Sequence, residues 1–201
     1  MTTPTATTRT TDLPIDADIL ARWSPRAFDA SALDKTTLHT LFEAARWAPS
    51  AYNAQPWRFV YALRDTPEWD ELLSALLPFN AAWAGQASAL LFILSDTQIT
   101  PPGAKAPVPS GTHSFDAGAA WGLMALQAAR LGLYTHAMAG FDRTRATQIL
   151  GSGEQFHIEA AVAVGRLGDP ASLPETLRAR EVPSPRLPLD EIAFHARLPL
   201  E

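Results

Sequence analysis

The sequence predicts one globular domain of mixed α and β structure, with about four β-strands and with helices placed irregularly between them. The chain has 201 residues, of which 47% are hydrophobic, so it can bury a sizeable core within one domain. Apolar residues recur at helical spacing in some segments and at a period of two in others. No predicted strand is followed by a GxGxxG turn, because Gly151 and Gly153 follow a helical pattern. A dinucleotide-binding Rossmann domain is therefore not favoured.

The first long helix is predicted between Ser31 and Pro49. Ser31, followed three residues later by Asp34, resembles a capping box, and Pro49 ends the pattern because proline lacks an amide hydrogen. The apolar positions at helical spacing are Leu38, Leu41, Phe42 and Ala45.

A second helix is predicted to begin at Pro67, with Thr66 as its N-cap, and to continue through Leu77 until Pro78 closes it. A short helical segment follows from Asn80.

The longest helix is predicted from Ser114 to Leu131, where small and apolar residues occur nearly all round and Gly132 provides the end. Gly118 and Gly122 would let another helix approach closely, either within the chain or across a dimer. A last helix is predicted from an N-cap at Asp142 to Leu150.

Strands are predicted at residues 57–63, 89–94 and 157–165, and a short strand followed by a turn is predicted within residues 134–140. In the first, Trp57, Phe59 and Tyr61 alternate with smaller or polar residues, so one face is aromatic. Residues 89–94 are apolar without interruption, which suits a strand buried on both faces.

The two ends of the chain differ in composition from its middle. Residues 1–12 are Thr-rich and are expected to be disordered, because they cannot bury enough apolar surface to offset the entropy of ordering. Residues 13–201 form the predicted single domain, with 168–201 as a Pro-punctuated C-terminal extension that wraps a partner subunit. The loop at 96–112, rich in Pro, Gly and Thr, is expected to be either a mobile lid or a plain surface loop.

Composition excludes several classes of function. The net charge of −5 argues against nucleic-acid binding, and no apolar run approaches the length of about 20 residues that a membrane span needs. With no apolar signal segment at its start, the chain is expected to be cytoplasmic. The chain contains no cysteine and no paired histidine spacing, so neither a thiolate nucleophile nor a metal site is predicted, and redox chemistry would need a bound cofactor.

The stretch RWSPR at 22–26 carries two arginines and a serine that point the same way. Pro25 pushes Ser24 out of the helical region, so Arg22, Ser24 and Arg26 lie on an extended segment with a period of two. Two guanidinium groups and a hydroxyl suit a phosphate monoester. The alternative is a solvated basic edge paired with acidic side chains.

The stretch APSAYNAQPWRF at 48–59 concentrates amide side chains between a helix and a strand. Pro49 and Pro56 restrict the backbone on either side of Asn53 and Gln55, so their amides are held in place. An amide offers both a donor and an acceptor, which suits the edge of a heteroaromatic ring. The alternative is that these side chains satisfy nearby backbone groups.

Taken in order, several segments resemble the FMN-dependent nitroreductase family. These segments are RWSPRAF, AARWAPSAYNAQPWRF, Asn80, LGLYTHAMAGFD and SPRLPLDEI, which span most of the chain. The resemblance implies an α+β, nitroreductase-like three-layer fold with a mixed, mainly antiparallel sheet flanked by helices. It also implies an intertwined homodimer whose C-terminal tails wrap the partner.

The resemblance implies FMN as the cofactor and assigns residues to it. The first motif, Arg22, Trp23, Ser24 and Arg26, would hold the phosphate and the pyrimidine side of the ring, with Arg186 also on the phosphate. Residues of the second motif would reach the flavin of the opposite subunit, and they are Pro49, Ser50, Ala51, Asn53 and Gln55. Asn80 would bond the ring edge, and the turn Met138, Ala139 and Gly140 would direct a backbone amide at flavin N5.

Two departures from the family concern positive charge. Some members carry a lysine shortly after the matched asparagine, where this chain has Ala81, Ala82 and Trp83, so Arg26 is expected to supply that charge. A second cation in the tail is also missing, because Ser184 and Pro185 precede Arg186.

The implied activity is an NAD(P)H-dependent flavin oxidoreductase that reduces nitroaromatics, quinones or similar small electron-poor acceptors by ping-pong, two-electron hydride transfer. FMN carries this chemistry, so no side chain is assigned a catalytic role, and His136 is expected to be structural. Two alternatives remain open. One is an FMN enzyme with another reaction, such as dehalogenation, dehydrogenation or flavin fragmentation, and the other is a flavin-binding sensor or partner protein.

Overall fold

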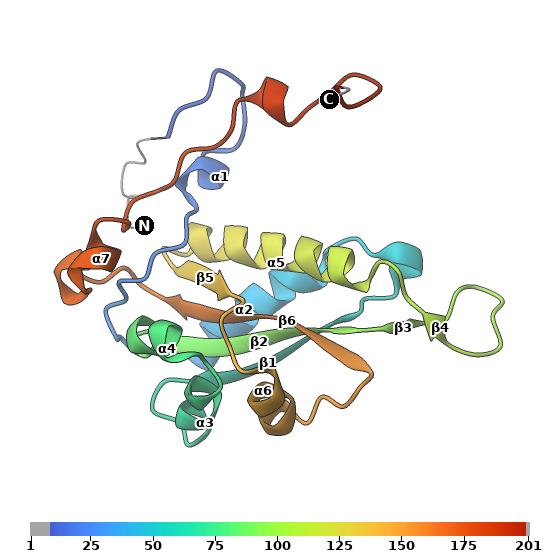
Figure 1. Cartoon of the computed structure of the whole chain (residues 1–201), viewed down its shortest axis with the longest axis horizontal. Coiled ribbons are helices and arrows are strands. Elements are labelled where there is room, and N and C mark those ends of the chain that lie inside the picture. The colour runs from blue at the N-terminus through green and yellow to red at the C-terminus, as the bar shows by residue number, and fades with distance from the viewer. Residues whose placement is uncertain (1–8, 200–201) are drawn as a thin grey trace.

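A computed structural model describes residues 9–199 and contains a four-stranded antiparallel sheet (Figure 1). The strand order is β1-β2-β6-β5, and the strands are β1 (Trp57–Leu63), β2 (Ala89–Asp96), β6 (Phe156–Gly165) and β5 (Tyr134–Met138). The four strands lie where the alternating and apolar patterns predicted them. Strands β1 and β5 form the two edges of this sheet.

Helices cover both faces of the sheet and make three layers (Figure 1). On one face lie α2 (Lys35–Arg46) and α5 (His113–Arg130), and on the other lie α3 (Glu68–Ser74), α4 (Pro78–Ala84) and α6 (Arg143–Leu150). Strand β2 is buried on both sides, since Leu90 and Phe92 pack in one core and Leu91 and Ile93 in the other. The predicted fold class is confirmed for the chain itself.

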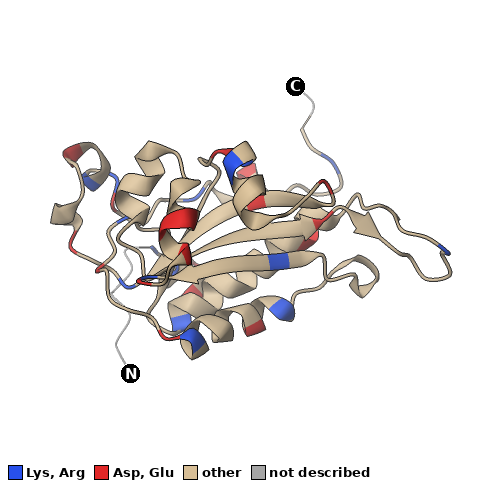
Figure 2. Ribbon diagram, turned by 90° about the horizontal axis from the view of Figure 1, so that it is seen from below, with Lys and Arg blue, Asp and Glu red and all other residues tan. Residues whose placement is uncertain are grey.

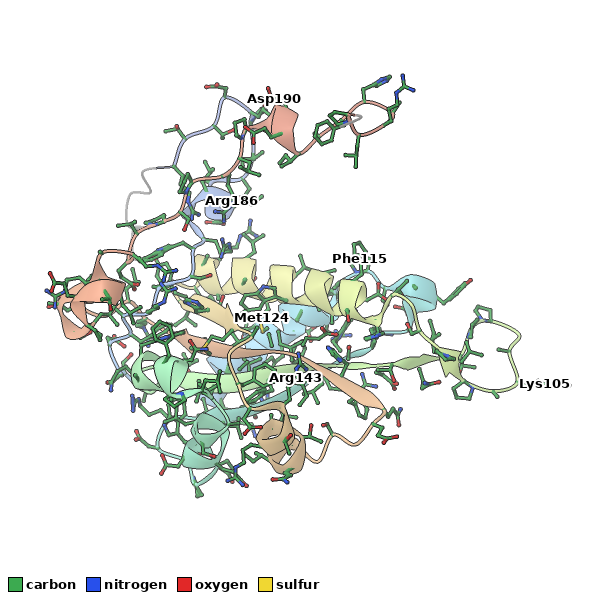
Figure 3. The ribbon with its side chains drawn as sticks, viewed as in Figure 1. Lys105, Phe115, Met124, Arg143, Arg186 and Asp190 are labelled. Atoms are coloured by element: carbon green, nitrogen blue, oxygen red, sulfur yellow. The ribbon has the colours of Figure 1, made fainter. Side chains whose placement is uncertain are left out.

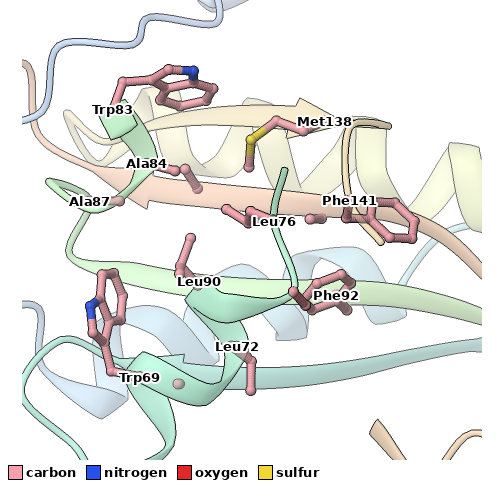
Figure 4. Close-up of a cluster of buried hydrophobic side chains, with 14 of the residues drawn as sticks. Trp69, Leu72, Leu76, Trp83, Ala84, Ala87, Leu90, Phe92, Met138 and Phe141 are labelled. Carbon is pink, nitrogen blue, oxygen red and sulfur yellow. The ribbon is translucent and has the colours of Figure 1, made fainter. Parts of the chain in front are cut away.

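The core under α3 and α4 is rich in aromatic side chains (Figure 4). Trp69 from α3 and Trp83 from α4 pack against β2 and β5, and the rings of Phe92 and Phe141 meet edge to face at 5.5 Å. This core therefore fixes α4 and the end of β5, which carry the predicted residues Asn80 and Met138.

Helix α2 begins later than the predicted capping box. Asp34 is its N-cap and accepts a hydrogen bond from the amide of Thr37 at 2.8 Å. The hydroxyl of Ser31 instead donates to Asp29 at 2.6 Å. The prediction of Ser31 as the cap was wrong because Asp34 caps the helix with its own carboxylate.

The predicted second helix is two helices. Helix α3 ends at Ser74, and Pro78 occupies the first turn of α4, where its missing amide hydrogen costs nothing. Thr66 does not cap α3, since its hydroxyl donates to the carbonyl of Leu63. Pro78 was expected to end a helix, and in fact it starts the helix that carries Asn80.

Helix α5 and α6 agree with prediction. Gly132 follows α5 with a φ of 70°, and Asp142 caps α6 by accepting from the amide of Arg145 at 2.9 Å. A Cβ at Gly118 or Gly122 would meet no atom within 4 Å, so no other described helix of this chain packs closely against these two glycines. Among the described helices, none has both the length and the hydropathy required to cross a bilayer.

The loop at 96–112 contains a hairpin that the sequence did not predict. Strands β3 (Gln98–Ile99) and β4 (Val108–Pro109) pair antiparallel, and the hairpin projects from the body with Lys105 at its tip (Figure 3). The expectation that this loop acts as a lid over a site stays a prediction.

The N-terminal arm and the C-terminal tail run side by side, away from the sheet (Figure 1). The arm contains α1 (Ala17–Ala21), and the tail contains α7 (Glu175–Arg178) and two 3-10 turns at Pro170–Ser172 and Leu189–Glu191. A third such turn lies at Ala51–Asn53. Of the segment expected to be disordered, residues 1–8 lie outside the described residues, whereas Arg9 donates hydrogen bonds to three carbonyl oxygens.

Residues 27–30 fasten the arm to the sheet. Phe28 and Leu167 form a β-bridge, and the amide of Gly168 donates to the carbonyl of Ala27 at 2.9 Å. A Cβ at Gly168 would overlap the backbone carbonyl of Phe28. The backbone of residues 27–28 can therefore lie this close only because position 168 is glycine.

We expect Gly168→Ala to destabilise the protein by about 1–3 kcal/mol, because the new methyl group must displace the backbone of Phe28. The urea midpoint of unfolding measures this change. Gly111→Ala is the matched control, since a Cβ there meets nothing within 4 Å, and it should change stability by less than about 0.5 kcal/mol. Equal midpoints for the two variants would contradict the proposed contact.

Candidate functional site

The RWSPR segment lines a cavity of about 400 Å³ between the arm, β5 and the C-terminal tail. Arg22 follows α1 in an extended conformation, with φ −66° and ψ 124°, as predicted for this segment. Five of the predicted site residues meet in this cavity, and they are Arg22, Trp23, Ser24, Arg26 and Arg186. The structure thus brings together residues 22–26 and a residue 160 positions later in the chain.

Positive charge is concentrated in this cavity although the chain is acidic overall. Its lining contains five arginines, Arg9, Arg22, Arg26, Arg180 and Arg186. The nearby carboxylate of Glu181 lies 4.0 Å from the Nη1 atom of Arg26. Elsewhere basic and acidic residues are interspersed along the helices (Figure 2). An excess of guanidinium groups in a partly enclosed cavity can attract and bind an anion.

Burial and mutual repulsion disfavour the charged form of these arginines. Burial lowers the pKa of Arg22, and the nearby Arg186 and Arg9 lower it further. Burial followed by Arg186 lowers the pKa of Arg9. Burial and then Arg180 lower the pKa of Arg26, whereas Glu181 raises it. An anion bound among these groups would relieve the repulsion.

Glu181 holds the RWSPR segment in place through the backbone. One carboxylate oxygen accepts from the amide of Arg26 at 2.6 Å and from the amide of Ala27 at 2.7 Å. The side chain is 2% exposed, and within the described residues its other oxygen has no hydrogen-bond partner. Sequence reasoning missed Glu181 and also Arg9 and Arg180, because no local pattern marks them.

His136 of β5 lines this cavity and also a second, neighbouring cavity, which is described below. Its Nδ1 lies 2.8 Å from the carbonyl oxygen of Pro25, so Nδ1 carries the hydrogen and donates it. The ring packs 4.6 Å from that of Trp83, and burial lowers the pKa of the imidazole. His136 therefore positions the RWSPR segment, as the structural prediction held, and also contacts both cavities.

The second cavity has a volume of about 420 Å³ and a more apolar wall. Arg22, Ser24 and His136 line both cavities, and α5 contributes Trp121 and Gly122 to the second. A ligand with an anionic end and a flat apolar part could therefore extend from one cavity into the next.

Residues 49–55, called the PSAYN segment below, have a strained backbone. Tyr52, Asn53 and Gln55 adopt positive φ values of 49°, 55° and 50°, which non-glycine residues rarely adopt. The carboxylate of Asp116 accepts from the amide of Ala51 at 3.1 Å, and the hydroxyl of Ser50 accepts from the amide of Gln55 at 3.0 Å. Strain held by such contacts is typical of functional loops.

This segment lies at the opposite end of the sheet from the arginine cavity. It precedes Trp57, at the start of β1, whereas the cavity adjoins the end of the sheet where Leu63 pairs with Ala89 and Tyr134 pairs with Gly165. Strand β1 separates the two ends by roughly 20 Å. One chain therefore does not bring Pro49, Ser50, Ala51, Asn53 and Gln55 to the arginines. The amide nitrogen of Gln55 donates to the carbonyl of Asn53, as the alternative interpretation expected.

Asn80 and the turn after β5 meet each other. The Nδ2 atom of Asn80 donates to the carbonyl of Gly140 at 3.0 Å, and a Cβ at Gly140 would clash with that amide. Met138 is buried in the core, whereas Ala139 is exposed at the end of the edge strand. Strand β5 connects this turn to His136 and hence to the cavities.

A comparison of the sequence with protein families decides the assignment. The profile of the nitroreductase family matches residues 19–166. The chain belongs to the nitroreductase family. The predicted resemblance is thereby confirmed, and so is the prediction of a flavin oxidoreductase at the level of the family.

Two relatives of this nitroreductase-family chain have the names of redox enzymes. It is 30% identical over 202 residues to an NADH dehydrogenase of Thermus thermophilus, covering 87% of this chain and 92% of the relative. It is 39% identical over 85 residues to a CLA biosynthesis enone reductase of Lactiplantibacillus plantarum, a match that spans 41% of this chain and 38% of that protein.

Solved structures of nitroreductase-like proteins have the same fold. One, described as an oxidoreductase containing FMN, superposes with a TM-score of 0.92 at 45% identity and covers the whole of both chains. Another, from Desulfovibrio desulfuricans and solved in complex with FMN, superposes with a TM-score of 0.69 at 25% identity, covering 94% of this chain and all of the other.

We expect Glu181→Gln to strengthen the binding of inorganic phosphate by about 1 kcal/mol, because it removes the negative charge nearest the arginines while keeping an acceptor oxygen. The phosphate-induced rise in melting temperature measures this change. Glu175→Gln makes the same charge change at an exposed position and should leave the rise unaltered. A weaker phosphate response in Glu181→Gln would contradict the charge argument.

His136 should make stability depend on pH. Because burial lowers its pKa below the unfolded value of about 6.5, the unfolded state binds more protons just below that pH. The free energy of unfolding should therefore fall as the pH drops through 6.5 toward the lowered pKa. At pH values well above 6.5, His136 should add nothing to the pH dependence of this free energy. His136→Asn keeps a donor for Pro25 and should reduce this slope, as measured by urea unfolding between pH 5 and 8. Identical slopes would contradict the assignment.

Proposed function

We propose that the protein is an FMN-dependent oxidoreductase that uses NADH or NADPH to reduce nitroaromatics, quinones or similar small electron-poor acceptors. The observation that carries this proposal is a cavity lined by five arginines, of which Arg26 lies 4.0 Å from the carboxylate of Glu181, within a chain of the nitroreductase family. The relative named as an enone reductase supports an electron-poor acceptor.

The residues of the cavity fit the phosphate of FMN. A phosphate monoester is a dianion at neutral pH, and the planar guanidinium groups of Arg22 and Arg186 can each donate two hydrogen bonds to it. The hydroxyl of Ser24 can donate to a further oxygen, and Trp23 lines the same wall. Arg26 is already drawn toward Glu181, so we assign it to the pyrimidine side of the ring.

The outer edge of β5 fits the flavin ring. An edge strand presents backbone amides that no neighbouring strand pairs, and Ala139 and Gly140 continue this edge. The missing side chain of Gly140 makes room for Asn80, which its bond to the Gly140 carbonyl holds beside this edge. Met138 anchors the turn in the core.

FMN supplies the hydride chemistry when it is bound, so the side chains of this protein need only bind and orient. The lowered pKa of His136 keeps its ring neutral near pH 7, and the positive charge at the cavity wall comes from the arginines. Arg26, as a cation near the pyrimidine ring, would stabilise negative charge on that side of a bound flavin.

A second copy of the chain would complete the site. The strained PSAYN segment is far from the arginines of its own chain, so we assign it to the flavin of the partner in a homodimer. A stripe on α5 supports such an interface, because Phe115 is 81% exposed and Leu123 37% exposed (Figure 3). Gly118 and Gly122 lie on the same stripe, with open space above them.

The C-terminal tail carries the apolar surface expected of a segment that wraps a partner. Its large apolar residues are mostly exposed, and they include Val182, Leu187, Leu189, Ile192, Phe194 and Leu198. Exposed apolar patches of this kind mark protein interaction sites. We therefore keep residues 168–201 as a partner-binding extension of the single domain.

We expect the purified protein to bind FMN and show its visible spectrum. Without oxygen, NADH or NADPH should bleach this spectrum, and a nitroaromatic or a quinone should restore it. Stopped-flow absorbance measures both half-reactions. A bound flavin that neither nucleotide reduces would favour a sensor or partner protein, and a protein that takes up no FMN would exclude the proposed activity.

We expect Arg22→Ala and Asn53→Ala each to lose FMN-dependent reductase activity as separate proteins, and to recover part of it when the two chains are unfolded and refolded together. In a mixed dimer, one site would combine an intact Arg22 from one chain with an intact Asn53 from the other, which restores about a quarter of the sites at random mixing.

The control for this mixing experiment is Arg22→Ala refolded with itself, which should recover nothing. If the mixture also recovers nothing while dimers form, the PSAYN segment does not serve the partner's site.

A further inference from the structure

We propose that Arg9 is a phosphate-binding residue, so that the N-terminal arm forms a third wall of the cofactor site beside residues 22–26 and the C-terminal tail. This role rests on the proposed function, and it adds a residue outside the segment 19–166 that the family profile matches. No motif in the sequence marks Arg9, which lies in a Thr-rich stretch.

The geometry directs Arg9 into the cavity. It lines the same cavity as Arg22, Ser24 and Arg186. Its Nη1 atom donates to the carbonyl of Arg22 at 2.7 Å, and its Nε atom donates to the carbonyl of Ser184 at 3.0 Å. These two bonds join the arm to the RWSPR segment and to the tail at the rim of the cavity.

The electrostatics of the three segments favour a shared anion. Arg9, Arg22 and Arg186 come from the arm, the RWSPR segment and the tail, and each lies close enough to repel the others. Among the ion pairs within residues 9–199, none joins Arg22 or Arg186 to a carboxylate. A dianion placed among three guanidinium groups replaces this repulsion by attraction.

A bound phosphate would therefore fasten the arm to the tail. The two segments already line a common apolar groove, to which the arm contributes Leu13 and Ile15 and the tail contributes Leu187 and Ile192. FMN should stabilise this contact, whereas riboflavin, which lacks the phosphate, should not.

The test measures the dissociation constants of FMN and of riboflavin by fluorescence quenching. Arg9→Ala should weaken FMN binding by roughly 10-fold to 100-fold, as expected for the loss of a charge-assisted hydrogen bond, and should leave riboflavin binding unchanged. Arg9→Lys keeps the charge and should lose less than Arg9→Ala. The matched control is Lys105→Ala, which removes one positive charge at the distant hairpin tip and should change neither constant (Figure 3).

Two outcomes would overturn the role of Arg9. One is an Arg9→Ala protein that binds FMN as tightly as the wild type. The other is an equal loss for FMN and riboflavin, which would mean that Arg9 shapes the cavity without contacting the phosphate.

A readout without flavin separates this inference from the proposed function. Inorganic phosphate should slow amide hydrogen exchange in the arm and in tail residues 182–187, and Arg9→Ala should abolish this protection. If the wild type takes up no FMN but shows Arg9-dependent protection by phosphate, the anion site stands and the proposed function fails. If FMN binds but phosphate slows exchange equally in the wild type and in Arg9→Ala, the proposed function stands and the role of Arg9 fails.

Discussion

The buried carboxylate of Glu181 joins the two ends of the chain at the place where the cavity forms. It accepts hydrogen bonds from the backbone amides of Arg26 and Ala27, and it forms an ion pair with the side chain of Arg26. Without this acceptor, two backbone N–H groups would lose their partner and the positive charges would face one another unopposed. The direction of the RWSPR segment, and hence the shape of the cavity, depends on this contact.

The sheet places the two halves of the candidate site at opposite ends. The arginines gather where β5 begins, and the strained PSAYN segment precedes β1 at the other end of the sheet. Asp116, at the start of α5, accepts a hydrogen bond from PSAYN, and the same helix presents the exposed apolar stripe of Phe115 and Leu123. The sheet and α5 therefore set the positions of both halves of the candidate site and of the exposed apolar stripe on α5.

Local signals were sufficient for most of the secondary structure but only for part of the site. Strand β1 and the Asp142 cap were predicted because alternation and capping depend on residues a few positions apart. Arg22, Ser24 and Arg26 were predicted for the same reason. Arg9 and Glu181 were missed because their partners lie far away in sequence, and the break in the second helix was missed because Pro78 suits a start as well as an end.

The strand order has a consequence for how the protein is made. Strand β2 lies between β1 and β6, and β6 ends only at Gly165, so β2 has just one of its two neighbours until the residues of β6 have left the ribosome. Glu181 emerges later still, more than 150 residues after the backbone that it binds. Contacts between such distant residues slow folding, and the nascent chain exposes unpaired strand edges meanwhile. The cavity can therefore close only after the segment that carries Glu181 and Arg186 has been synthesised.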